Sequence, residues 1–296
     1  MQFKTAQDFD QELLILFDAY VHGTLDRRGF LDRAQKFAVG GMTAGMLLAA
    51  LSPDFARAQV APKDDKRITT ERVEYPSTAG TGTVKGYLAK PANATGKLPV
   101  VLVVHENRGL NPHIEDIARR LALDNFVAFA PDALTPLGGY PGDEDKAREL
   151  FAKLDQKKAT EDFVAAANYL KSRPESSGKM GVVGFCYGGG MAHTLAVRMP
   201  ELNAAVPFYG NHPAAEDAVK VKAPLLIHFA GVDERINSAW PAYEAALRAA
   251  GTRYTAHQYA GTQHGFNNDT TPRFDAIAAK LAWERTLTFF NAQLRA

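Results

Sequence analysis

Residues 180–190, MGVVGFCYGGG, contain the pattern that decides the fold. Met180–Phe185 is a short apolar run, typical of a strand covered on both faces, and the stretch Gly189–Met199 that follows is helical in character. Between them, Gly184-Phe185-Cys186-Tyr187-Gly188 matches the G-x-nucleophile-x-G turn, with cysteine in place of serine. The turn is so sharp that side chains two residues before and after its central residue would clash, which explains the two glycines.

Cys186 is the only cysteine of the chain, so no internal disulfide can form. At the start of a helix its sulfur would meet the positive end of the helix dipole, which stabilises a thiolate. The backbone N–H of Tyr187 would then point toward an oxyanion formed at the same site. The alternative is a buried structural cysteine beside a glycine turn, and the surroundings of the motif decide between the two.

Short apolar strands alternate with amphipathic helices on both sides of this motif. Strand–helix alternation predicts an α/β fold with a mainly parallel sheet and helices on both faces. No inserted segment is long enough for a separate lid domain. A helix is expected around Ile114–Leu121, a long helical stretch between Asp143 and Ser172, and a terminal helix over 272–294 that buries Ile277, Leu281, Trp283, Leu287 and Phe290. The expected strands are Arg67–Glu74, Gly82–Lys90, Pro99–Val104, Phe126–Ala130, Met180–Phe185, Ala204–Phe208, Leu225–Ala230 and Arg253–Tyr259.

An acid and a histidine follow the cysteine in the chain order that a hydrolase elbow requires. Asp233 comes directly after the strand Leu225–Ala230, and His264 lies in the loop between the last strand and the last helix. Carboxyl ends of parallel strands share one edge of the sheet, so these side chains are expected to meet Cys186. His264 would act as general base and then acid, while Asp233 fixes its tautomer.

The segment His105-Glu106-Asn107-Arg108-Gly109 follows the strand Pro99–Val104 directly. A loop at this strand end supplies the second oxyanion N–H in such folds, here that of Asn107. A glutamate in this loop is unusual for a serine esterase. Its simplest interpretation is a solvated carboxylate.

The four motifs HENRG, GFCYGG, GVD and HGF together resemble those of the dienelactone hydrolase family of α/β-hydrolases, over residues 66–296. The resemblance implies that Cys186, Asp233 and His264 form the catalytic triad. It also implies that Glu106 is the additional carboxylate of the family, which lies beside the resting thiol and helps to take its proton when substrate binds. A thiolate that forms only with substrate present is protected from oxidation.

The sequence departs from the family at the groups that hold a substrate carboxylate. Members that cleave dienelactone carry an arginine four residues after the catalytic histidine, where this chain has Asn268, and another in the loop that corresponds to Pro131–Pro136. Bidentate recognition by a guanidinium is hard to replace, so we expect an ester or lactone substrate other than dienelactone. Candidate pocket residues are Arg108, Tyr140, Tyr187, Tyr209, His212 and Trp240, with Arg235 and Arg273 as further cations.

The composition restricts the partners. The 34 Lys and Arg residues balance 33 Asp and Glu residues, a net charge of +1, which argues against nucleic acid as the main partner. No histidine pair has the HExxH spacing, and a single cysteine makes a zinc site unlikely, so no metal and no organic cofactor is expected. The rival functions are a redox-sensing thiol protein, which would lack a resolving cysteine, and a small acyl-amide or peptide hydrolase.

Residues 1–58 differ from the rest and predict a leader, with the catalytic domain at 59–296. Asp26-Arg27-Arg28 precedes the uncharged run Phe37–Leu51, and Ala56-Arg57-Ala58 follows it, which resembles a twin-arginine export signal cleaved after Ala58. This interpretation implies the export machinery as a partner and a periplasmic or secreted enzyme. Against it, residues 1–58 hold 6 basic and 7 acidic residues, and Leu13–Val21 is apolar enough for a packed helix. The alternative is a retained helical arm in a cytoplasmic protein, packed on the body or on the second subunit of a homodimer.

Overall fold

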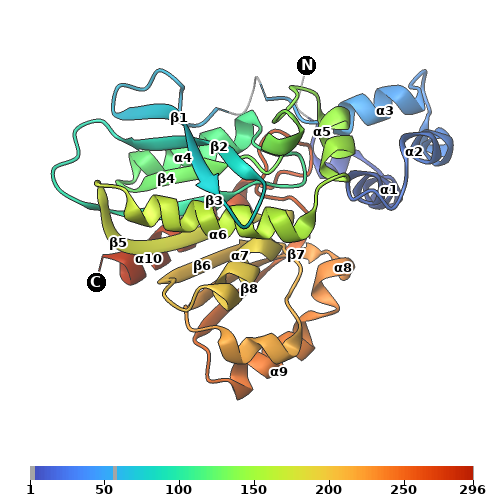
Figure 1. The fold of residues 1–296 in the computed structure, drawn as a ribbon. Coiled ribbons are helices and arrows are strands. Elements are labelled where there is room, and N and C mark those ends of the chain that lie inside the picture. The colour runs from blue at the N-terminus through green and yellow to red at the C-terminus, as the bar shows by residue number, and fades with distance from the viewer. Residues whose placement is uncertain (1–3, 56–58, 296) are drawn as a thin grey trace.

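The computed structural model describes residues 4–55 and 59–295, and its centre is one mainly parallel sheet (Figure 1). The 8-stranded sheet has the order β1-β2-β4-β3-β5-β6-β7-β8. Strand β2 is antiparallel to both of its neighbours, β1 and β4, and the strands from β4 to β8 in this order pair in parallel. All the expected strands are present. Their bounds are β1 Ile68–Ser77, β2 Gly82–Pro91, β3 Leu98–Val104, β4 Val127–Pro131, β5 Ser176–Phe185, β6 Ala204–Phe208, β7 Leu225–Val232 and β8 Tyr254–Gln263.

Helices cover both faces of the sheet and bury a separate apolar layer on each. One layer contains residues of α6 (Gln156–Ser172), α7 (Tyr187–Arg198) and α9 (Trp240–Ala249). The other contains residues of α4 (Pro112–Leu123) and α10 (Ala276–Leu294). This is the α/β-hydrolase fold that the alternation of strands and helices predicted.

Two helical predictions need correction. The expected helical stretch between Asp143 and Ser172 is two helices, α5 (Glu144–Phe151) and α6, because Asp155 caps the N-terminus of a new helix with its carboxylate. In α10, Ile277 is 83% exposed and Leu281 40% exposed, so the prediction that they are buried was wrong. The helix instead buries the small residues Ala278, Ala279 and Ala282, which allow it to approach the sheet closely.

Residues 4–55, which we call the N-terminal arm, form a small helical unit beside α5 (Figure 1). Its elements are η1 (Ala6–Asp8), α1 (Gln11–Val21), α2 (Arg27–Ala34), η2 (Gln35–Phe37), α3 (Ala44–Leu51), and α1–α3 share an apolar core of their own. Arg27 and Arg28 begin α2, and only the last part of the uncharged run Phe37–Leu51 is α-helical. The predicted cleavage motif 56–58 lies outside the described residues. Within those residues, no helix combines the length and the apolar character that crossing a bilayer requires.

Gly188 tests how strictly the turn at Cys186 depends on glycine. A Cβ at Gly188 would lie 2.1 Å from the carbonyl oxygen of Val104. Both partners belong to the backbone, so no side-chain rotation can relieve the clash. Gly188→Ala should therefore lower the free energy of unfolding by about 3 kcal/mol or more, measured by denaturant titration. Gly190→Ala is the matched control, because its nearest neighbour would lie at 3.5 Å, and helical alanine is favoured over glycine by about 1 kcal/mol. Equal stability of the two variants would contradict this account of the turn.

Candidate active site

Cys186 lies at the turn between β5 and α7 in a strained backbone conformation. Its φ is 56° and its ψ is −111°, a region that residues with a side chain rarely adopt. The strain is held by the surroundings, since the N–H of Cys186 donates to Phe208 O at 3.1 Å and the N–H of Gly190 donates to Cys186 O at 3.2 Å. The side chain is therefore fixed at the carboxyl edge of the sheet, where the sequence motif predicted it.

His264 and Asp233 form a buried pair next to this cysteine. Nδ1 of His264 lies 2.6 Å from Oδ2 of Asp233, and the two side chains are 5% and 3% exposed. Asp233 follows β7 and His264 follows β8, so the parallel register brings both to the edge that holds Cys186. Nε2 of His264 is buried without a hydrogen-bond partner among the described residues. Asp233 thus fixes the tautomer, and Nε2 is left for the reaction.

Mutual charge stabilisation dominates the protonation of the site. Burial alone would raise the pKa of Cys186, but the imidazoles of His264 and His22 lower it to about 5. Burial alone would lower the pKa of His264, but the Cys186 thiolate and Asp233 raise it to about 10. Each group therefore stabilises the charged form of the other, and this favours a thiolate–imidazolium pair in the resting site.

The loop after β3 places Glu106 and Asn107 in the lining of the same cavity as Cys186. Glu106 Oε2 accepts a hydrogen bond from Asn268 Nδ2 at 2.8 Å, so the residue that replaces the family's arginine holds the additional carboxylate. His105 is buried below the loop: its Nε2 accepts from Ala133 N at 3.1 Å and its Nδ1 donates to Glu106 O at 2.5 Å. These bonds fix the backbone that carries the predicted oxyanion N–H of Asn107. Tyr187, the other predicted donor, is the first residue of α7.

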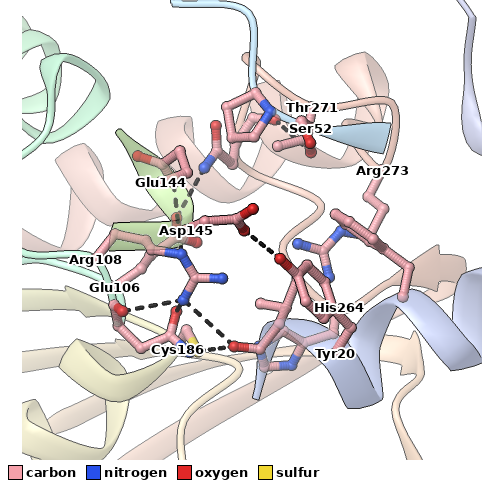
Figure 2. Close-up of a pocket in the computed structure, with 15 residues that line it drawn as sticks. Tyr20, Ser52, Glu106, Arg108, Glu144, Asp145, Cys186, His264, Thr271 and Arg273 are labelled. Carbon is pink, nitrogen blue, oxygen red and sulfur yellow. Dashed lines mark hydrogen bonds and ion pairs between the residues drawn. The ribbon is translucent and has the colours of Figure 1, made fainter. Parts of the chain in front are cut away.

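Two cavities meet at Cys186, and both are formed between the N-terminal arm and the body. The first, the Glu106 cavity, has a volume of about 50 Å³ and also contacts Arg108, His264 and Asn268 (Figure 2). The second, the Tyr187 cavity, has a volume of about 240 Å³. Its lining combines apolar and aromatic groups with two guanidinium groups: Val21, His22, Gly23, Asn107, Arg148, Phe151, Ala152, Cys186, Tyr187, Tyr209, Asn211, Arg235 and Ile236.

The structure brings three of the six candidate pocket residues to these cavities: Arg108, Tyr187 and Tyr209. The two further candidate cations, Arg235 and Arg273, line them as well. Tyr140 lines neither cavity, and its hydroxyl instead donates to Glu144 Oε1 at 2.9 Å. His212 and Trp240 also lie outside both linings. Their rings pack against each other and His212 packs against Tyr243, because Trp240 and Tyr243 lie on α9, whose aromatic side chains form this cluster.

Sequence reasoning missed the contribution of the arm. His22 Nε2 lies 3.3 Å from the sulfur of Cys186, and Asp18 forms ion pairs with Arg273 at 3.3 Å and Arg235 at 3.9 Å. The only signal in the sequence was the apolar run Leu13–Val21, which indicated a packed helix but not its position. Glu144 was also missed: burial raises the pKa of this carboxyl to about 7, and it lines the Glu106 cavity.

Three side chains could in principle share a metal ion. One ligand atom each of His22, Cys186 and His264 lies within 4.8 Å of the others. However, Nη2 of Arg235 lies 3.1 Å from Nε2 of His22 and 3.4 Å from Nδ1 of His264. A permanent positive charge at this distance opposes a divalent cation, so the geometry fits an anion at the sulfur better than a metal.

The comparison with known protein families agrees with this site. Residues 84–294 match the model described as the dienelactone hydrolase family. The chain belongs to the dienelactone hydrolase family. Members of this family hydrolyse ester or lactone bonds, and so does this enzyme. The arm is recognised separately, since residues 1–39 match a family described as YqhI-like.

Individual relatives of this family member support the assignment. A "Putative carboxymethylenebutenolidase" of Escherichia coli O157:H7 is 33% identical over 69% of this chain and 81% of its own length. A "Putative hydrolase fragment YghX" of Escherichia coli K12 is 53% identical over 38% of this chain and 97% of its own length. Among solved structures, the "Putative Dienelactone Hydrolase" from Klebsiella pneumoniae has a TM-score of 0.65 at 29% identity, covering 75% of this chain and 98% of its own.

The protonation of Cys186 can be measured directly, because it is the only thiol. The rate of alkylation by iodoacetamide should rise with a midpoint near pH 5, since a lowered thiol pKa keeps the thiolate present above that pH and loses it only as pH falls through it. In His264→Ala the midpoint should move up toward the ordinary value of 9.0, because the largest stabilising charge is gone. A midpoint of 8 to 9 in the unmodified enzyme, about where a free cysteine titrates, would contradict the ion pair.

Proposed function

We propose that this enzyme is a cysteine-dependent hydrolase that cleaves a small carboxylic ester or lactone through a thioester acyl-enzyme. The observation that carries the proposal is the strained position of Cys186 beside the buried His264–Asp233 pair. A thiol in a strained turn at a helix start, next to a histidine oriented by a carboxylate, is the arrangement of nucleophilic catalysis. The match to the dienelactone hydrolase family supports the same chemistry.

Acylation begins with attack of the Cys186 thiolate on the substrate carbonyl carbon. The carbonyl π electrons move to oxygen, and the resulting oxyanion accepts hydrogen bonds from the backbone N–H groups of Tyr187 and Asn107. When the tetrahedral intermediate collapses, the C–O bond to the alcohol breaks. The leaving alkoxide takes its proton from Nε2–H of His264, which remains oriented by Asp233.

Deacylation uses the same groups in reverse roles. Neutral His264 removes a proton from water, and the hydroxide attacks the thioester carbonyl. The C–S bond then breaks, which releases the carboxylic acid and restores the thiolate. Glu106, held by Asn268 at 2.8 Å, lines the same cavity as the sulfur, so its carboxylate can accept the proton of Cys186 whenever the thiol form is present. The family resemblance implied a resting thiol, whereas the charges around Cys186 favour a thiolate before substrate binds, which makes this role of Glu106 a minor one here.

The substrate that fits the site is small and does not depend on the family's arginine pattern. The Tyr187 cavity of about 240 Å³ is below the usual range of pockets for drug-sized ligands. Asn268 holds Glu106 instead of offering a guanidinium to a substrate carboxylate. These two features support a substrate different from dienelactone itself.

Two other functions compete with this proposal. A redox-sensing protein would use the same reactive thiol, but Cys186 has no second cysteine in the chain to resolve a sulfenic acid. A small acyl-amide or peptide hydrolase would use the same three residues. Turnover rates measured on a panel of esters, lactones and short amides would distinguish an amide hydrolase from an ester or lactone hydrolase. Peroxide consumption without turnover of any ester would favour the sensor.

Cys186→Ala tests the nucleophile. Removal of the sulfur should lower kcat for a small activated ester by about 10⁴-fold or more, as in other enzymes that lose a triad member. The thermal unfolding midpoint should stay close to that of the unmodified enzyme, since alanine occupies less space in the same turn. Mass spectrometry of acid-quenched enzyme should detect an acyl adduct on Cys186 that the variant lacks. Unchanged turnover in the variant would remove the cysteine mechanism.

The fate of residues 1–58 is part of the proposal. We propose that the N-terminal arm stays attached in the working enzyme, because its contacts with Cys186, Arg273 and Asp145 would be lost if it were removed. Export by the twin-arginine route to the periplasm stays a prediction from the motif at Arg27–Arg28. That route carries folded proteins, but cleavage after Ala58 would remove the arm. Homodimer formation likewise stays a prediction.

The mature N-terminus separates these two fates. Intact-mass measurement of the enzyme purified from its native host should give the mass of a chain that contains residues 4–55. A mass that corresponds to a start at Gln59 would show that the arm is a cleaved signal and that the mature site is open.

A further inference from the structure

The N-terminal arm is bound to the body by polar contacts rather than by a shared core. Its apolar cluster contains only residues between Leu13 and Leu51. Among the described residues, its contacts with the body include hydrogen bonds and ion pairs: Asp18 with Arg235 and Arg273, Tyr20 and Arg27 with Asp145, Val21 O with Asn107 and Arg108, Gln11 with Gln263, and Asp54 N with Thr270 O. Two guanidinium groups of the body also lie over aromatic rings of the arm, Arg148 over Tyr20 and Arg273 over Phe17. An interface of this polar type is typical of units that separate and dock again.

The end of α1 forms a wall of the space in which a substrate has to lie. The carbonyl oxygen of Val21 accepts hydrogen bonds from Asn107 Nδ2 at 2.8 Å and Arg108 Nη1 at 3.3 Å, on the loop that carries a predicted oxyanion donor. Both cavities at Cys186 contain Val21 in their lining. The arm therefore shapes the space around the nucleophile and limits its size.

His22 contacts the reacting atom itself. Its Nε2 lies 3.3 Å from Sγ of Cys186, and its ring is 4.8 Å from that of His264 at an angle of 83°. Nδ1 of His22 lies 2.8 Å from Asp18 O and 3.3 Å from Asp18 Oδ2, which keeps a proton on Nδ1 and directs Nε2 at the sulfur. His22 and Asp18 thus repeat, from the other side, the arrangement of His264 and Asp233.

His22 competes with a substrate for access to the sulfur. A substrate carbonyl carbon has to come within about 3–3.5 Å of the sulfur to react, and Nε2 of His22 already lies 3.3 Å from it on one side. Cys186 is only 8% exposed while the arm is docked, although the Tyr187 cavity reaches it. A small substrate can approach through that cavity, whereas a larger one requires the arm to move.

We propose that the N-terminal arm is a cap over the active site, in which His22 binds the resting sulfur of Cys186 and the end of α1 forms the wall that selects small substrates. The inference rests on the proposed function, because it assigns the cap to the nucleophile of that reaction. Release of Asp18 from Arg235 and Arg273 opens the cap, and return of His22 protects the thiolate between turnovers.

Charged groups from every element packed around this contact lie near it. They are Asp18 and His22 from α1, Glu106 and Arg108 from the loop after β3, Glu144, Asp145 and Arg148 from α5, Asp233 and Arg235 from the segment after β7, and His264 and Arg273 from the segment after β8. The thiolate of Cys186 raises the pKa of His22 against the effect of burial, with Asp18 acting in the same direction. Loss of His22 removes one of the two positive charges that stabilise the thiolate.

The test combines alkylation of the single thiol with esters of two sizes, in the full chain. Asp18→Asn removes the ion pairs of the arm with the body, and Tyr20→Phe independently removes the hydrogen bond to Asp145. Glu12→Gln is the matched control, because Glu12 lies on the same helix and pairs only with Lys36 of the arm among the described residues.

In Asp18→Asn and Tyr20→Phe, labelling of Cys186 by a bulky maleimide should be faster by about fivefold, which corresponds to about 1 kcal/mol of docking free energy, and Glu12→Gln should match the unmodified enzyme. The ratio of kcat/KM for a long-chain over a short-chain ester should rise by a similar factor. His22→Ala should raise the midpoint of the alkylation pH profile by about one unit or more. Identical labelling rates and ester ratios in the unmodified enzyme and in Asp18→Asn, Tyr20→Phe and Glu12→Gln would overturn the cap.

The alkylation readout does not depend on turnover. If Cys186→Ala keeps its ester hydrolysis while Asp18→Asn still labels faster, the cysteine mechanism fails and the cap over Cys186 stands. If Cys186→Ala is inactive and the arm variants label like the unmodified enzyme, the mechanism stands and the cap fails.

Discussion

The strained backbone at Cys186 is the constraint on which the rest of the structure depends. A residue with a side chain at φ 56° is held there only because β5 and α7 pack so closely that the turn has no other path. A Cβ at Gly184 would lie 1.9 Å from Gly188 O, and a Cβ at Gly188 would lie 2.1 Å from Val104 O, so close backbone contacts exclude a side chain at either glycine. The parallel strands that follow place Asp233 and His264 at the same sheet edge as this turn.

The arrangement of charges around Cys186 is the second feature on which the site depends, because it determines the protonation of the sulfur. Burial opposes every charge in the site, yet two imidazoles and two aspartates lie around the sulfur, and their mutual attraction exceeds the cost of removing them from water. The pKa of Cys186 is lowered as a result. A stable thiolate is an effective nucleophile and is also open to oxidation, which gives a physical reason to cover it between turnovers.

The N-terminal arm lies outside the part of the chain that matches the dienelactone hydrolase family. The family match covers 84–294, and the arm matches a different family model over residues 1–39. Enzymes on this fold usually acquire selectivity from loops at the carboxyl edge of the sheet. Here the N-terminal segment lies at that edge, and it brings His22 of the arm to the sulfur of Cys186, next to the His264–Asp233 pair.

The sequence by itself determined the sheet, the elbow and the meeting of Cys186, Asp233 and His264 at one sheet edge, because each depends on local signals: apolar runs, flanking glycines and the position of a residue just after a strand. The buried face of a helix was harder to predict, as the exposed Ile277 shows, because a helix rich in alanine can bury a face of small residues instead of its large apolar ones. Only the tertiary structure decided that Asn268 holds Glu106 and that His22 reaches Cys186. The second contact joins residues 164 positions apart through docking of a separate helical unit, and no local pattern encodes where such a unit binds.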